Sequence, residues 1–119
     1  MFIGLAYLAA KHAIADFFLQ TKYMYANKGT YGHPGGLLHV LIHLGLSAPL
    51  LWILPPPSAL FGALVLGGEL VVHYHCDWAK EKIVKGNGWT FTDDNYWRAT
   101  GIDQLVHGLT YIAMVRALV

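Results

Sequence analysis

Four long apolar segments separated by shorter polar ones constrain the fold of this chain more than any other feature. They run approximately over residues 2–25, 37–54, 58–80 and 96–118. Each holds roughly 18 to 24 residues, which as a helix is enough to cross about 30 Å of hydrocarbon. Backbone groups in lipid must bond within their own helix, and the short alternating strands of a membrane barrel are not seen. The sequence therefore predicts an all-α fold, an integral membrane four-helix bundle that forms a single transmembrane domain over residues 1–119.

The composition fits this class of protein. The chain is 55% hydrophobic and 13% charged, against about 25% charged residues in an ordinary soluble domain. A net charge of +1 without a basic run argues against nucleic acid as a partner. The N-terminal apolar stretch lacks a basic start and is interrupted by Lys11 and His12, so we expect a retained first span, not a cleaved signal peptide.

Basic residues predict the orientation of the bundle. The loops after the first and third segments carry most of the lysine and arginine side chains, whereas the opposite side holds only Arg116. The positive-inside rule then places both termini on the non-cytoplasmic side, and we expect a bacterial inner membrane as the location. The residues of the basic side are Lys22, Lys28, Lys80, Lys82, Lys85 and Arg98.

Every apolar segment also carries histidine or acidic residues spaced four apart. This spacing places each set on one face of its helix. A carboxylate inside the membrane costs several kcal/mol unless it has a partner. Depths estimated from a rise of about 1.5 Å per residue bring all four sets into the same half of the bundle, which predicts one polar cluster on the cytoplasmic side. Its nine members are His12, Asp16, His39, His43, Glu69, His73, Asp77, Asp103 and His107.

These residue types indicate a metal centre. Imidazole and carboxylate groups are the usual ligands of zinc, non-haem iron and manganese. One ion takes three or four protein ligands, so nine side chains predict either two ions or one ion with surrounding partners. We predict one or two divalent ions, with zinc ahead of iron and manganese. For any single pair, an ordinary hydrogen bond between helices is the alternative, and His33, His75 and Cys76 are expected outside the site.

Four stretches, "HAIADFFLQ", "HVLIH", "ELVVHYHCDWAK" and "GIDQLVH", together resemble one known family. This family comprises small bacterial and phage membrane proteins classed as domain of unknown function 3307. The resemblance implies a small multi-pass membrane protein with a His/Asp/Glu cluster, but it implies no particular reaction. The cluster is more loosely similar to membrane-embedded metal-dependent hydrolases such as zinc-dependent ceramidases. It is also somewhat similar to di-iron desaturases, whose paired His-His motif is absent here.

The leading hypothesis is a metal-dependent hydrolase that acts on a lipid or lipid-linked substrate. Asp16, Glu69 or Asp77 would be the general base, and Lys80 would contact the substrate's head group. For Lys80, simple extension toward the membrane interface is the alternative. Two other functions stay open: a structural or haem-binding electron-transfer subunit of a larger membrane complex, and an ion or proton path through an oligomer.

Overall fold

The computed structural model describes all 119 residues and contains helices without strands, which confirms the predicted all-α fold. The elements in order are α1 (Phe2–Ala13), the π-helical η1 (Ile14–Phe18), α2 (Lys22–Asn27), α3 (Pro34–Ser47), α4 (Leu50–Ile53), α5 (Ala59–Gly86) and α6 (Asp94–Leu118).

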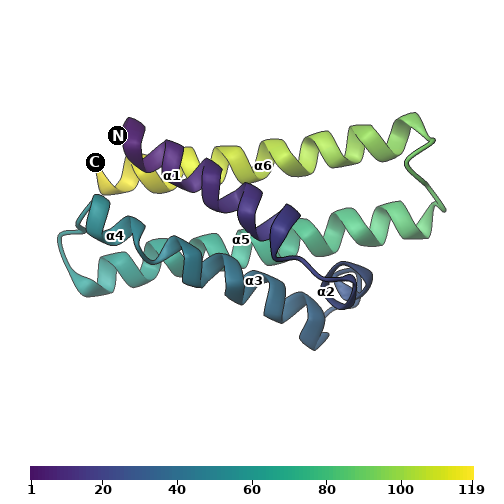
Figure 1. Ribbon diagram of the computed structural model, residues 1–119, viewed down its shortest axis with the longest axis horizontal. Coiled ribbons are helices and arrows are strands. Elements are labelled where there is room, and N and C mark those ends of the chain that lie inside the picture. Colours follow the sequence, from purple (N-terminus) through teal and green to yellow (C-terminus); the bar gives the residue numbers. More distant parts are fainter.

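The four longer elements α1, α3, α5 and α6 enclose a common interior. The helix α5 packs against α3 and α6, and α1 completes the ring by packing against the same two helices. Figure 1 shows α5 and α6 side by side, with α1 crossing them and both termini at the end that carries α4. The loop between α5 and α6 lies at the opposite end, as does α2, so the bundle has a terminal end and a loop end.

The first apolar segment is not the single helix over residues 2–25 that we expected. The helix widens into a π turn, in which the Leu19 N–H donates to the Ile14 carbonyl at 2.9 Å. The chain then becomes extended at Thr21, and α2 begins in a new direction. The Gln20 side chain donates to the Asp16 carbonyl at 3.1 Å and so satisfies one of the acceptors left at the helix end. Because of this break, the first helical stretch is only about 25 Å long.

The other helix ends also differ from the predicted bounds. The helix α3 starts at Pro34, where the His33 ring accepts a hydrogen bond from the Gly35 N–H at 3.0 Å and proline fits the first helical position. The helix α5 runs on to Gly86, beyond the expected end at Lys80, because glutamate and lysine are good helix formers. The polar loop before α6 is correspondingly shorter than predicted, and α6 begins at Asp94.

The interior of the bundle is unusually polar. Its hydrophobic core is small and lies in the terminal half, around Leu8, Leu50, Tyr111, Met114 and Val115. Ten of the 23 buried residues are polar or charged, while Trp52, Phe18 and Phe2 are 84%, 80% and 79% exposed. This distribution is the reverse of that in soluble domains, where charged side chains are almost never fully buried.

Two helical stretches are long and apolar enough to cross a membrane, judged by length and composition. They are Pro34–Ile53 and Ala59–Gly86. Four such spans were expected. The break after η1 shortens the first, and polar residues such as Asp103, His107 and Arg116 lower the hydropathy of α6.

Candidate metal centre

Five imidazole rings from α1, α3, α5 and α6 converge in the interior of the bundle. His73 lies between His43 and His107, with ring centroids 3.9 and 4.1 Å apart. His39 and His12 flank this stack, each within 5.6 Å of His43. All five rings direct their Nε2 atoms toward aspartate carboxylates from three different elements.

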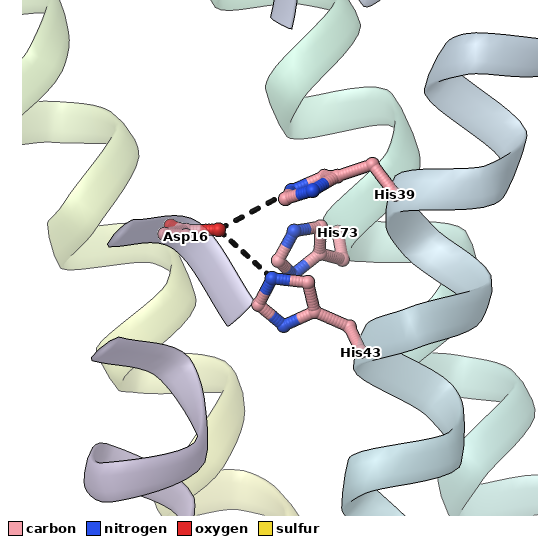
Figure 2. Close-up of side chains that lie close together, drawn as sticks. All are labelled: Asp16, His39, His43 and His73. Atoms are coloured by element: carbon pink, nitrogen blue, oxygen red, sulfur yellow. Dashed lines mark hydrogen bonds and ion pairs between the residues drawn. The ribbon is translucent and has the colours of Figure 1, made fainter. Parts of the chain in front are cut away.

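Asp16 is the first of these carboxylates and comes from the π turn η1. Its Oδ1 atom lies 2.8 Å from His43 Nε2 and 3.2 Å from His39 Nε2. Its Oδ2 atom lies 3.1 Å from the Nε2 atom of His12, one turn earlier. Figure 2 shows the two α3 imidazoles reaching Asp16 from one side, with the His73 ring from α5 beside them. The π turn thus places a carboxylate against imidazoles from both α1 and α3, and π turns are frequent at functional sites.

Asp77 on α5 is the second carboxylate and lies between two groups of imidazoles. Its Oδ2 atom is 3.2 Å from His39 Nε2 and 3.3 Å from His73 Nε2. Its Oδ1 atom is 3.1 Å from His107 Nε2. The buried Lys28, which follows α2, also reaches Oδ2 at 3.2 Å. A carboxylate with each oxygen facing a different group is suited to lie between two cations.

Asp103 on α6 is the third carboxylate. Its Oδ1 atom is 3.3 Å from His107 Nε2 and 3.3 Å from the Cys76 sulfur. Cys76, which we expected outside the site, thus contacts Asp103 and belongs to one candidate group of ligands. Cys76 precedes Asp77 by one residue, so its side chain is rotated by about 100° around the α5 axis. The Cys76 side chain therefore faces α6 and not the centre of the bundle.

Glu69 is placed differently from the other predicted ligands. It forms an ion pair with the Lys11 ammonium group, and both side chains are only 2% exposed. The Lys11 nitrogen also lies 3.2 Å from His43 Nδ1, so Glu69 joins the polar cluster through lysine. Lys80, the expected head-group contact, pairs with Glu81 at 2.8 Å and lies outside the imidazole cluster.

Three groups of side chains could each hold an ion. Within each group, the ligand atoms lie within 4.8 Å of one another. Eight of the nine predicted ligands lie in or directly against these groups, and Glu69 does not. The groups are Asp16–His39–His43–His73, His73–Asp77–His107 and Cys76–Asp103–His107.

Several nitrogen atoms of the cluster have no partner, and an ion would supply one. Neither ring nitrogen of His39 or His73 has a hydrogen bond of good geometry, although all four atoms are buried. Buried polar atoms without partners are rare and costly. Nε2 lone pairs that point at carboxylate oxygens about 3.2 Å away become favourable when a cation lies between them.

The net charge of the buried side chains is also compatible with a bound ion. The interior holds four carboxylates, Asp16, Glu69, Asp77 and Asp103, against the two ammonium groups of Lys11 and Lys28. Four negative and two positive charges leave −2 when the imidazoles are neutral, and either one divalent ion or two protonated imidazoles would balance that charge. An uncompensated charge of this size in the interior would be strongly unfavourable.

Two side chains beside His12 were not predicted. Its Nδ1 atom lies 2.7 Å from the Tyr111 hydroxyl, and its Nε2 atom lies 2.9 Å from Gln104 Oε1. Tyr111 continues the four-residue spacing of Asp103 and His107 along α6, so this signal was present in the sequence. Such hydrogen bonds orient imidazoles around metal ions.

The two remaining histidines lie outside the cluster. His33 caps α3, and the exposed His75 bonds to the Tyr31 hydroxyl at 2.9 Å.

Comparison with known proteins adds one finding. The family model described as "Protein of unknown function (DUF3307)" matches residues 5–119, a range that includes every residue of the cluster. No curated protein and no solved structure matches the chain.

Proposed function

The chain belongs to the DUF3307 family, and we propose that it is an integral membrane metalloprotein that binds one or two divalent metal ions. The observation that carries this proposal is the convergence of five imidazoles and three aspartates, with the ring nitrogens of His39 and His73 left without partners. Zinc suits these ligands best, and iron or manganese also fit.

The distribution of apolar side chains supports a location in the membrane. Large hydrophobic residues cover the outside of the bundle, and two of its helical stretches have the length and hydropathy of membrane spans. Lipid tails would cover this surface, which in water would be an unusually large exposed apolar area. With basic residues concentrated at the loop end, both termini would face away from the cytoplasm of a bacterial cell.

The residues divide naturally between two ions. Asp16, His39, His43 and His73 would hold one of them, and His107 with Asp103 would hold the other. Asp77 would lie between the two ions, because its two oxygens face different imidazoles. Carboxylate-bridged pairs of ions are the usual product of four helices that each direct ligands inward.

Hydrolysis of a lipid or lipid-linked substrate is the reaction that this arrangement supports best. A bound divalent ion supplies a readily deprotonated water and polarises a carbonyl or phosphoryl oxygen. Asp16 and Asp77 each contact three imidazoles, which favours a ligand role for both. Glu69 is paired with Lys11, and Asp103 lines a groove that opens to the surface, so the ion held by Asp103 and His107 would be the one that a substrate reaches.

The ring geometry favours an ion over a haem group. The ring centroids of His43, His73 and His107 lie 3.9 and 4.1 Å apart, with the ring planes tilted by 42° and 34°, so the neighbouring rings leave no room for a porphyrin between them. A scaffold whose polar cluster only fixes helix packing remains the competing function, and metal analysis separates the two.

The test is elemental analysis of protein purified from membranes without added metal. We expect at least one equivalent of zinc, iron or manganese, no Soret band, and loss of the metal in the double variant His73→Ala/His107→Ala. A matched variant, His75→Ala, changes an exposed histidine of α5 and should retain the metal. Metal-free wild type would show that the cluster is a scaffold, and full metal content in the double variant would overturn the assignment of His73 and His107 as ligands.

A further inference from the structure

A groove between α5 and α6 leads from the loop end of the bundle to the metal cluster. It has a volume of about 360 Å³. Asp103 and Cys76 belong both to its lining and to one of the three candidate ligand groups. Figure 1 shows the two helices running side by side toward the loop that joins them. The groove therefore connects the surface of the protein with the third carboxylate of the site.

Two cations line this groove. The Arg98 guanidinium bonds to Asn95 Oδ1 at 3.0 Å and has no carboxylate within 4.0 Å. Lys80 forms one ion pair, with Glu81. Because Cys76 touches Asp103 and the helices are antiparallel, Lys80, one turn further along α5, comes level with the residues next to Arg98. An arginine without a carboxylate partner offers a planar fork of donors that matches a phosphate.

The walls between these cations and Asp103 are apolar. They include Ala79, Ala99 and Ile102, and Ile102 is 64% exposed on the outside of the bundle. Trp89 in the loop also lines the groove, and tryptophan is enriched where membrane meets water. A charged head at the loop end and apolar walls toward the centre of the bundle are complementary to an amphiphile lying in the membrane.

We propose that this groove binds an anionic glycerophospholipid, with the phosphate at Arg98 and Lys80 and the chains against Ala79 and Ile102. Arg98 precedes Asp103 by five residues, which is about 7.5 Å along the helix axis. The glycerol esters of a phospholipid begin a few bonds from its phosphate, so this binding mode would bring an ester next to Asp103. That the bound lipid is the substrate rests on the proposed hydrolase function; the binding itself does not.

Native mass spectrometry of the detergent-solubilised protein, titrated with phosphatidic acid, tests the inference. We expect one phosphatidic acid per chain and an affinity about tenfold lower in Arg98→Gln, the loss typical of one charge-assisted contact. The matched control is Arg116→Gln, the same change on the same helix at the terminal end, which should shift affinity less than twofold. Lys80→Gln and Lys82→Gln form a second pair. Lys80 lines the groove and its variant should lose affinity, whereas Lys82 does not line it and its variant is the control.

Further ligands and variants separate this inference from the proposed function. Phosphatidylcholine and glycerol 3-phosphate should both bind at least tenfold more weakly than phosphatidic acid. The head group of phosphatidylcholine has no net negative charge, and glycerol 3-phosphate has no acyl chains. Equal affinity for either ligand, or equal losses in Arg98→Gln and Arg116→Gln, would overturn the inference. Arg98→Lys keeps the charge and should lose less affinity than Arg98→Gln if the fold is intact. Metal content is measured in every variant: a metal-free wild type that still binds phosphatidic acid through Arg98 would refute the metalloprotein alone.

Discussion

We expect the replacement of His73 with leucine to have opposite effects on stability with and without a bound ion. This ring is 1% exposed, lies between two other imidazoles, and has no hydrogen-bond partner for either nitrogen. Leucine has a similar volume and no polar atom. The substitution therefore removes one predicted ligand and two unsatisfied polar atoms while leaving the interior filled.

The size of each effect follows from these contacts. An unsatisfied buried polar group costs about 1–3 kcal/mol, so in metal-free protein His73→Leu should stabilise the fold by about that amount. An ion at a thousand times its Kd stabilises the folded state by about 4 kcal/mol. When the variant no longer binds that ion, it should be less stable than wild type by about 1–3 kcal/mol.

Thermal unfolding in detergent, with zinc or with a chelator, measures both effects. We expect His73→Leu to melt below wild type in zinc and above it in chelator. His75→Leu is the control, because its ring is exposed and lies outside the cluster; it should differ from wild type equally in both conditions. The reasoning is refuted if His73→Leu is the more stable protein in zinc as well and the chelator leaves wild type unchanged.

Three further substitutions test other parts of the structure. Tyr111→Phe removes the hydroxyl that bonds to the α1 imidazole and should weaken zinc binding about tenfold in a chelator competition. Its control is Tyr7→Phe, which loses a hydrogen bond to a backbone carbonyl in the terminal half and should leave zinc affinity unchanged. Gly35→Ala would bring a Cβ atom within 2.7 Å of a backbone oxygen of α2 and should destabilise the protein by about 1–3 kcal/mol in thermal unfolding. Gly45→Ala is the control: a Cβ atom there has nothing within 4 Å, so this variant should be neutral or stabilising. Lys11→Met leaves the buried glutamate of α5 without its partner and should cost about 3–5 kcal/mol, a loss that replacing the glutamate with glutamine should partly restore.

The helical class and the composition of the cluster could be predicted because both depend on local periodicity. Four-residue spacing pairs His39 with His43 and Asp103 with His107 on one helix face, whatever the neighbouring helices do. Similar depths in four helices then bring these faces together. This reasoning holds even for Asp16, because its carboxylate still reaches the imidazole four residues before it across the π turn.

Features that depend on contacts between helices could not be predicted in the same way. The partner of Lys28 is an aspartate 49 residues away, and no spacing in the sequence relates the two. In the sequence Lys11 interrupts the first apolar segment, but its pairing with Glu69 depends on the relative positions of α1 and α5. The break at residues 19–21 was missed because the segment remains apolar on both sides of it, and hydropathy does not report helix continuity.

The most direct test of the metal centre is X-ray absorption spectroscopy of the purified protein at the edge of whichever metal it carries. We predict a first shell of nitrogen and oxygen at about 2.0–2.2 Å, with the outer scattering typical of several imidazoles. A spectrum dominated by sulfur, one of a hydrated ion without imidazole scattering, or a protein without any metal to measure would contradict the central claim.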